Sequence, residues 1–378
     1  MFSSSAHKYN VPVFKKDQPD DSFKFQPLPS PTDKYPYHLD VSATDVKLGD
    51  QKLVFHMVGD TGSIRSPDFQ KLVAAQMEAQ FVEADEADKP AFLFHLGDVV
   101  YNHGEVERYQ TQFFEPYKDY PRPIFAIAGN HDSDVNPDNP VPYKSLDAFM
   151  KVFCAGSADV LSFSGNNARK SMMQPNVYWM LNTPLANIIG LYGNVTKFGS
   201  IEQEQRDWYI SQLNWVKKNE PEKALIVCVH HAPYTADINH GSSEEMIRLF
   251  DNAYKETGVK PDIVFSGHVH NYQRFSKKYA DGGIVPFIVA GAGGYDELHP
   301  VALRNDNRFT SESTWFDGVH LENYCDDKHG FLNVSIEKNK EGLLASIKYY
   351  TIPHEKIMEG FEPAQLADEY TWLLDKKG

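Results

Sequence analysis

Residues 92–101 read FLFHLGDVVY, an apolar run that stops at Gly97 and Asp98. A continuous apolar run of this length is typical of a strand that is buried on both faces of a sheet. The polar residues that follow then lie at the carboxyl end of that strand. This pattern indicates the fold class, because the same short buried strand with a polar ending recurs along the chain.

Six such runs, each rich in Val, Ile or Phe, lie at 53–58, 92–96, 124–128, 225–229, 263–265 and 287–290. Between these runs, apolar residues recur at helical spacing and predict three helices. Two of them cover 202–218 and 244–257. The other is capped by Ser66, has Pro67 in its first turn and ends near Val82. The order strand, helix, strand predicts an α/β fold in which helices cover the sheets.

The remaining segments predict the domain organisation. Residues 1–50 lack a sustained period and contain several prolines, which indicates an N-terminal arm. Residues 51–350 form the main domain, with an irregular insertion at 133–200 that could shape a substrate rim, and paired strands at 330–337 and 343–351. Residues 363–375 are expected to form a final helix, so 351–378 become a C-terminal helical extension packed on the same domain.

Composition excludes several classes of protein. The chain has 378 residues and a net charge of −15, which would repel nucleic acid. Its longest apolar runs, such as 284–292, are far shorter than the roughly 20 residues of a membrane helix. Three cysteines without CxxC spacing argue against a disulfide scaffold and a thiolate zinc site. The first residues do not resemble a secretory signal, so we expect a cytoplasmic protein, or a secreted one if the chain is a trimmed precursor.

Polar residues that can bind metal ions follow five of the strands. Since strand carboxyl ends converge on one edge of such a sheet, these residues should share a site. The five blocks are Gly59-Asp60-Thr61-Gly62, Gly97-Asp98-Val99-Val100-Tyr101, Gly129-Asn130-His131-Asp132, His230-His231-Ala232-Pro233 and Gly267-His268-Val269-His270. Their oxygen and nitrogen donors, without a thiolate, indicate a metal site large enough for two ions.

The residue types suit a two-metal site. A carboxylate such as Asp98 has two oxygens and can bridge two cations roughly 3.5–4 Å apart, which can clamp a displacement at phosphorus. Asn130 offers a neutral carbonyl oxygen, and imidazoles bind borderline divalent ions. The phenol of Tyr101 becomes a ligand only if a strong Lewis acid removes its proton, so a trivalent ion such as iron is indicated.

Each motif taken alone also has a purely structural explanation. A lone GDTG is a strand-to-turn signal, and two histidines at i and i+2 converge only on a loop. Gly291–Gly294 fits a tight turn better than a phosphate loop. His56 and His95 lie inside strands and fit a core, while Arg274 fits a phosphate fork or a structural ion pair. The ordered recurrence of all five blocks favours the metal site.

The five blocks together resemble those of the calcineurin-like metallophosphoesterases. The GDxxY block ending in Tyr101 resembles the purple acid phosphatases in particular, where that tyrosine binds ferric iron. The first block, Asp60-Thr61-Gly62, also resembles purple acid phosphatases, because many other members have Asp-x-His there. The resemblance covers about residues 51–350. It implies a four-layer α/β/β/α sandwich with a dinuclear metal site at the carboxyl edge of the strands.

The resemblance also implies the metal ligands. A ferric site would use Asp60, Asp98, Tyr101 and His270. A second site, for zinc, manganese or iron, would use Asp98, Asn130, His231 and His268. His231 is preferred to His230 because the family ligand precedes a proline by two residues, here Pro233.

Four further residues are candidates for catalysis or substrate binding. His131 resembles the substrate-binding histidine of the family and would steady the transition state or protonate the leaving oxygen. Asp132 is expected to orient it. His230 could contact a phosphate oxygen, and His103 could reach the pocket from its place after Tyr101.

The expected activity is that of an acid phosphatase, which hydrolyses small phosphomonoesters by attack of a metal-bound hydroxide. One alternative keeps the site and changes the substrate to a phosphodiester, such as a nucleotide or a lipid head group. An alternative of another class is a non-hydrolytic metal-binding protein. Plant-type enzymes carry an N-terminal β-sandwich that residues 1–50 cannot build, so the resemblance does not settle the substrate, and the sequence gives no oligomeric state.

Overall fold

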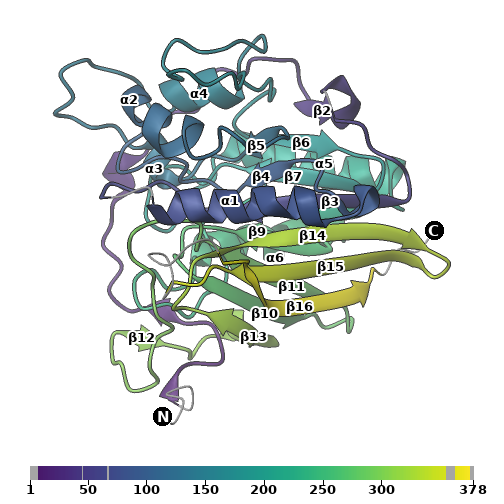
Figure 1. The fold of residues 1–378 in the computed structure, drawn as a ribbon. Helices are drawn as coiled ribbons and strands as arrows, with labels where there is room; N and C mark the ends of the chain where they lie inside the picture. The colour runs from purple at the N-terminus through teal and green to yellow at the C-terminus, as the bar shows by residue number, and fades with distance from the viewer. Residues whose placement is uncertain (1–6, 45, 66–67, 355–361, 375–378) are drawn as a thin grey trace.

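The structure is a computed structural model that describes residues 7–44, 46–65, 68–354 and 362–374 (Figure 1). Two mixed β-sheets face each other, with helices on the outer faces. The apolar side chains between the sheets and under the helices form one large core, which includes Phe55, Phe94, Trp179 and Val227. The core explains why the predicted strands carry continuous apolar runs, since both faces of each strand are covered.

One sheet has six strands in the order β16-β15-β14-β3-β4-β5. Its three parallel strands are β3 (Lys52–Val58), β4 (Leu93–His95) and β5 (Ile124–Ala126). Its antiparallel strands are β14 (Gly330–Asn339), β15 (Gly342–Thr351) and β16 (Gln365–Leu373). The predicted strands at 53–58, 92–96, 124–128, 330–337 and 343–351 therefore belong to this sheet.

The other sheet has eight strands in the order β13-β10-β11-β9-β8-β7-β6-β2. Their bounds are β2 (His38–Asp40), β6 (Trp179–Asn182), β7 (Ala186–Leu191), β8 (Ala224–Val229), β9 (Ile263–Ser266), β10 (Tyr272–Lys278), β11 (Ile284–Ala290) and β13 (Val319–Cys325). Strands β7, β8, β9 and β11 run parallel, so their carboxyl ends lie at one edge. A separate short pair joins β1 (Phe14–Lys15) to β12 (Phe309–Thr310).

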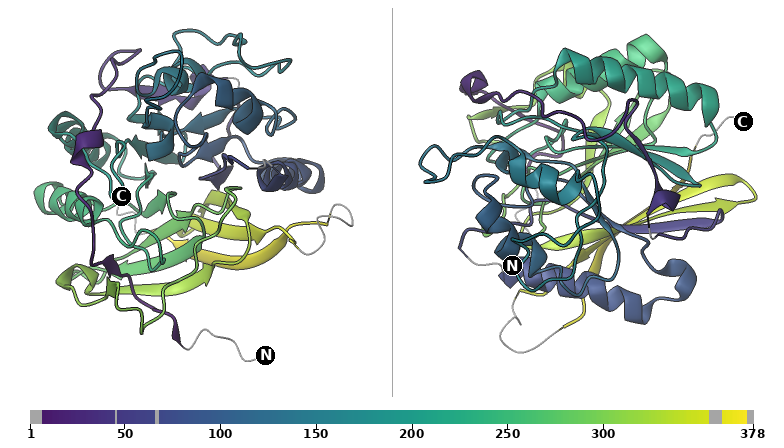
Figure 2. Two further views of the ribbon diagram at one scale, coloured as in Figure 1. Left: turned by 90° about the vertical axis from the view of Figure 1, so that its left-hand side faces the viewer. Right: turned by 90° about the horizontal axis from the view of Figure 1, so that it is seen from above.

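Helices complete four layers. Helix α1 (Asp68–Glu83) lies beside the six-stranded sheet, and α5 (Gln203–Asn219) and α6 (Glu244–Thr257) lie on the far side of the eight-stranded sheet (Figure 2). This arrangement confirms the predicted α/β/β/α fold. The cap predicted at Ser66 and Pro67 lies outside the described residues. Among the described residues, no helix combines the length and the apolar character needed to cross a bilayer.

The predicted final helix at 363–375 is wrong as far as the structure describes it. Residues Gln365–Leu373 form β16, which pairs antiparallel with β15 in the register Leu344↔Leu373 to Thr351↔Gln365. Asp368, Tyr370 and Trp372 are half-buried on one face, and their neighbours are exposed. Burial therefore alternates with a period of two residues, as in a strand. Leu366, Tyr370 and Leu373 also recur at helical spacing, which explains the wrong prediction.

The insertion at 133–200 is more regular than predicted. It contains α4 (Asp147–Phe153) and the two buried strands β6 and β7, which pair antiparallel near the edge of the eight-stranded sheet. The short helices α2 (Val106–Tyr109) and α3 (Asn130–Ser133) lie on the same side of the molecule (Figure 1). The described part of the arm, from residue 7 onward, adds β2 to the end of the eight-stranded sheet beside β6.

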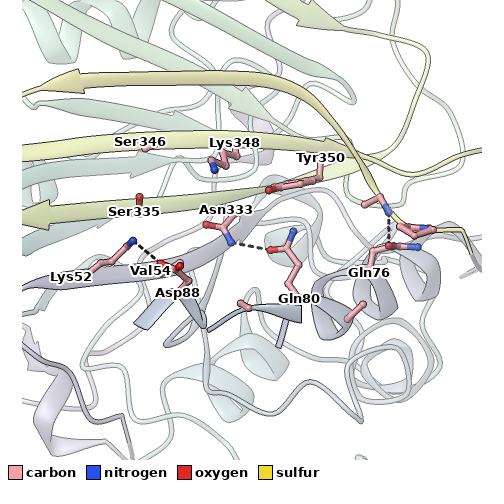
Figure 3. A pocket seen from close by; sticks show the side chains of 14 residues that line it. Lys52, Val54, Gln76, Gln80, Asp88, Asn333, Ser335, Ser346, Lys348 and Tyr350 are labelled. Atoms are coloured by element: carbon pink, nitrogen blue, oxygen red, sulfur yellow. Dashed lines mark hydrogen bonds and ion pairs between the residues drawn. The ribbon is translucent and has the colours of Figure 1, made fainter. Parts of the chain in front are cut away.

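A groove opens between α1 and the outer face of β3, β14 and β15 (Figure 3). Two pairs of its polar side chains bond to each other. Lys52 pairs with Asp88 at 2.6 Å, and the Asn333 amide donates to Gln80 at 2.9 Å. Lys52 is the first residue of β3, so the groove lies away from the carboxyl end of that strand, where the predicted metal ligands follow.

Candidate metal centre

Three predicted ligands follow strand ends in the left-handed backbone conformation: Asp60 (φ 57°), Asp98 (φ 53°) and His268 (φ 69°). For a residue with a side chain this conformation costs roughly 1–2 kcal/mol. Bonds between the loops hold it. The Asp60 N–H donates to the Gly97 carbonyl at 2.9 Å, and the His268 N–H donates to Oδ2 of Asp60 at 2.8 Å. Such strain gathers at functional sites, where it aims side chains at a shared point.

The four residues predicted for ferric iron lie together. The Tyr101 hydroxyl is 2.9 Å from Oδ2 of Asp98, 3.2 Å from Oδ1 of Asp60 and 3.1 Å from Nε2 of His270. All four side chains are buried. The Nδ1–H of His270 donates to the Glu297 carbonyl at 3.1 Å, so Nε2 carries the lone pair that faces the group. These spacings suit donors around one ion.

A second group of donors shares Asp98. Its carboxylate, His230 and His268 present ligand atoms within 4.8 Å of one another. Nε2 of His230 lies 3.2 Å from Oδ2 of Asp98 and 3.2 Å from Oδ1 of Asn130, and its Nδ1–H donates to the Leu96 carbonyl at 2.8 Å. The ring between Asp98 and Asn130 is therefore that of His230, whereas the sequence favoured His231.

His231 lies beside the same group. Its ring centroid is 4.6 Å from that of His268, and burial lowers its pKa well below the usual value, so the ring is neutral. Neither ring nitrogen meets a hydrogen-bond partner among the described residues. Gly193 leaves room for this ring, since a Cβ there would come within 2.3 Å of Nδ1. A buried imidazole with two unpartnered nitrogens fits a metal ligand.

The two carboxylates of the centre are buried, and among protein groups the ring of His230 faces them. Burial raises the pKa of Asp60 to about 7, and nearby Asp98 adds to the shift. Burial lowers the pKa of His230, but the charges of Asp98 and Asp60 outweigh burial and raise it to about 9. Two carboxylates out of water need a positive charge beside them. Without metal a protonated His230 supplies this charge. The donor types and their spacing fit metal ions that would replace that proton.

His131 lies at the rim of the centre. Its backbone N–H donates to Oδ1 of Asp98 at 2.9 Å, and its ring packs on that of Tyr101 with centroids 4.4 Å apart. The ring Nδ1–H donates to the Asn102 carbonyl at 2.6 Å. Nδ1 therefore holds a proton, and Nε2 is left for a molecule in the pocket.

Asp132 does not orient His131 as predicted. Its fully buried carboxylate accepts backbone N–H groups from Gly129 at 2.9 Å, Val99 at 3.0 Å and Val100 at 3.1 Å. It ties the loop that carries Asn130 to the loop that carries Asp98, which makes it a positioning residue. His103 pairs with Asp134 at 3.3 Å and is not among the residues that line the pocket of the centre.

Other residues singled out in the sequence have structural roles. Nδ1 of His56 meets the Tyr120 hydroxyl at 3.0 Å, and Nε2 of His95 meets the Thr61 hydroxyl at 2.9 Å, as expected of core histidines. Arg274 forms the expected ion pair, with Asp368 at 2.7 Å. In Gly291–Gly294, a Cβ on Gly293 would come within 2.2 Å of the Gly59 carbonyl, so the segment is a tight turn against another loop.

A pocket of about 160 Å³ opens above the centre. Its lining includes Asp98, Tyr101, His131, His268 and His270, together with five residues that the sequence analysis missed: Asn239, His240, Tyr295, Glu297 and His299. These five lie in the loops that follow β8 and β11. Both loops begin at the sheet edge where the predicted ligands lie. This shared edge is the signal in the sequence from which the five residues could have been predicted.

Comparison with protein families gives one match, described as calcineurin-like phosphoesterase, over residues 53–272. Among curated proteins, purple acid phosphatase 1 of Ipomoea batatas is 28% identical over 237 residues, which covers 60% of this chain and 43% of that protein. Purple acid phosphatase 21 of Arabidopsis thaliana is 27% identical over 187 residues, covering 47% of this chain and 37% of the relative. Each match thus spans less than half of the relative.

Two solved structures share the fold. A purple acid phosphatase from seeds of yellow lupin (Lupinus luteus) superposes with a TM-score of 0.56 at 16% identity, covering 86% of this chain and 55% of that chain. GAP50, described as the anchor in the inner membrane complex of Plasmodium, superposes with a TM-score of 0.54 at 16% identity, covering 87% and 90%. At these identities the likeness concerns the fold alone.

Proposed function

The chain belongs to the calcineurin-like phosphoesterases, and we propose that it is a phosphatase that hydrolyses small phosphomonoesters at the candidate metal centre. The family match confirms the resemblance deduced from the strand-end motifs, with purple acid phosphatases as distant relatives. The observation that carries the proposal is the contact of the Tyr101 hydroxyl with Asp60, Asp98 and His270. A buried phenol among two carboxylates and an imidazole suits ferric iron.

We assign ferric iron to the group around Tyr101, and zinc, manganese or iron to the second group. That second group consists of Asp98, Asn130, His268 and the histidine pair, in which His230 faces Asp98 and His231 lies beside His268. Two bound cations supply Lewis acidity, which polarises phosphate oxygens and lowers the pKa of a water molecule. Asp98, whose Oδ2 faces both Tyr101 and His230, is the residue placed to serve both ions.

The protein groups around the pocket would position the ester. With Nδ1 of His131 committed to the Asn102 carbonyl, Nε2 is available to a phosphate or leaving-group oxygen. Asp132 keeps the loops of Asn130 and Asp98 in register. A pocket of about 160 Å³ has room for one phosphate group, with the rest of the ester toward the opening.

A non-hydrolytic role is the rival of another class, since GAP50 shares the fold and is described as an anchor. Here the full donor set at the strand ends supports hydrolysis, because every position predicted for a metal ligand holds a residue able to bind one.

The test compares p-nitrophenyl phosphate with its bis-ester analogue on one metal-loaded preparation. We expect a kcat/KM at least tenfold higher for the monoester, and its loss in Asp98→Asn. Preference for the diester would replace the proposal with phosphodiesterase activity, and metal-loaded protein without turnover of either ester would support the non-hydrolytic role.

A further inference from the structure

A cavity of about 410 Å³ lies near the amino end of β5, away from the metal centre. One wall is formed by residues 118 and 120–123, which precede β5, whereas the predicted ligand Asn130 follows the carboxyl end of that strand. The other wall comes from residues 158 and 167–173 of the insertion, and Leu39 and Thr44 of the arm complete it. Among the described residues, this basic cavity shares none with the pocket above the metal centre.

The basic cavity carries positive charge, although the chain as a whole has a net charge of −15. None of the described residues that line it has a carboxylate, and four of them are cationic: Lys118, Arg122, Arg169 and Lys170. Within the described ranges, Arg122 and Lys170 form no ion pair. The ammonium of Lys118 lies 3.7 Å from Asp119, and because both side chains are exposed this pair is weak. The cavity therefore attracts anions.

Arg169 holds the two walls of the basic cavity together. Its guanidinium donates to the carbonyls of Tyr117 at 2.8 Å, Tyr120 at 2.5 Å and Arg122 at 3.0 Å. These acceptors are neutral, so the bonds fix the guanidinium without cancelling its charge. Glu78 acts on this charge, but burial raises the pKa of Glu78 to about 7, so its carboxylate is only partly ionised near neutral pH.

Apolar side chains supply the largest share of the remaining lining. They are Leu39, Pro121, Pro123, Ala158, Ala168, Met172 and Met173. Met173 is 42% exposed, and a flexible thioether side chain of this kind adapts to flat apolar groups. Ligand pockets have volumes of roughly 300–1,000 Å³ and combine a mainly apolar lining with a few polar groups that fix orientation. The basic cavity has both properties.

We propose that the basic cavity binds a small organic anion, with its apolar body against the methionines and prolines and its anionic head at Arg122 and Lys170. The apolar lining would remove the body from water, and the two side chains would donate charge-assisted hydrogen bonds to a sulfonate, carboxylate or phosphate head. A neutral apolar molecule lacks the second interaction, and a simple inorganic anion lacks the first. The inference does not depend on the proposed function, because the cavity contains no predicted metal ligand.

The experiment measures binding of anilinonaphthalene sulfonate, whose fluorescence rises in apolar surroundings. Phenylnaphthylamine, which has the same rings without the sulfonate, is the neutral probe. We expect the double variant Arg122→Glu and Lys170→Glu to bind the sulfonate about tenfold or more weakly and the neutral probe less than about threefold more weakly. Both substituted side chains are exposed, so the variant should fold, which circular dichroism checks.

The matched control is the double variant Lys218→Glu and Lys255→Glu, which makes the same change of net charge at exposed positions of α5 and α6. It should bind both probes as the unaltered protein does. Equal losses of sulfonate affinity in the two double variants would overturn the inference, because the net charge of the chain and not the basic cavity would then set the affinity.

Crystals of the unaltered protein soaked with the sulfonate locate the bound probe. We expect density between Arg122 and Met173. Density at the metal centre alone would overturn the inference, even if the variants misfold. Neither result bears on ester hydrolysis, and absence of turnover would leave the basic cavity standing, so this test and that of the proposed function fail separately.

Discussion

The hydroxyl of Tyr101 lies 2.9 Å from Oδ2 of Asp98, the carboxylate shared by both donor groups. Burial and the nearby carboxylates raise the pKa of Tyr101 well above its usual value. Water alone will not ionise this phenol near neutral pH, so a bound phenolate requires a strongly Lewis-acidic ion.

Replacing Tyr101 with Phe should therefore abolish the visible absorption band that we expect of the iron-loaded protein. The measurement is an absorption spectrum of freshly purified protein with its iron content. Tyr295→Phe is the control, because that ring lies 4.4 Å from Tyr101 and its hydroxyl is not in the donor group. A band that survives in Tyr101→Phe would remove Tyr101 from the iron site.

The histidine pair gives a second prediction. His230→Ala should lower the content of the second metal and the kcat more than His231→Ala does, because Nε2 of His230 lies 3.2 Å from both Asp98 and Asn130. Since outer-shell partners alone change metal affinity by about 10–100-fold, the loss for His230 should exceed about 100-fold. Metal titrations of the two variants measure their affinity for the second metal. A larger loss of affinity in His231→Ala would restore the assignment made from the proline spacing.

Asp132→Ala should destabilise the protein by about 3 kcal/mol, because it leaves buried backbone N–H groups of Gly129, Val99 and Val100 without their acceptor. Urea unfolding measures this change. Asp134→Ala is the comparison, since its carboxylate pairs with the partly exposed His103 and, among the described residues, accepts only one backbone N–H, that of Val135. Its expected cost is below about 1 kcal/mol. Similar costs for both variants would contradict the positioning role.

Glu78 should make stability depend on pH. Burial raises its pKa to about 7 from a usual value of 4.5, so the folded state holds this proton more tightly than the unfolded state. Stability therefore falls as pH rises from about 4.5 to 7 and stays low above that range.

Glu78→Gln should accordingly raise Tm at pH 8 and change it little at pH 4. Because Glu78 is only half-buried, solvent screening keeps the gain small. Thermal melts at both pH values measure it. Glu86→Gln, at an exposed carboxylate that pairs with Lys89, should show no such gain, and equal shifts for the two variants would count against the burial of Glu78 as the cause.

Metal removal should lower Tm, because the buried carboxylates of Asp60 and Asp98 then lose their counter-charge. An ion at 1,000 times its Kd stabilises by about 4 kcal/mol per site. Thermal melts before and after dialysis against a chelator measure the fall in Tm. A further melt after the ions are returned shows whether the fall is reversed. A Tm that does not change would contradict a metal centre at these carboxylates.

Much of the fold could be predicted because the central strands carry continuous apolar runs ended by glycine or histidine. Strand β8 is an example, since Leu225 to Val229 are all apolar and His230 follows. The last strand could not be assigned, because Leu366, Tyr370 and Leu373 fit a helical period while pairing with β15 imposes a period of two. Strand β6 was missed because Trp179–Asn182 is short, follows an irregular polar stretch and is stopped at once by Thr183 and Pro184.

The candidate site was predictable where a ligand directly follows a strand, as Asp60 and Asn130 do. It was not predictable where a side chain reaches the pocket from deep within a loop. His299 lies nine residues beyond the end of β11, and its position against His270 depends on the folded path of that loop. The choice between His230 and His231 depends on which ring turns toward the other sheet, and adjacent residues carry no periodic signal for that.

The donors of the centre come from both sheets: Asp60, Asp98 and Asn130 follow β3, β4 and β5, whereas His230, His268 and His270 follow β8 and β9. The affinity for metal ions therefore depends on how the two sheets are aligned with each other. Phe94 of β4 packs on Trp179 of β6 across this interface. A substitution at Phe94 or Trp179 changes no metal ligand. If it shifts one sheet relative to the other, the donors from the two sheets no longer meet. Inherited variation in the core can then lower metal binding while the protein still folds.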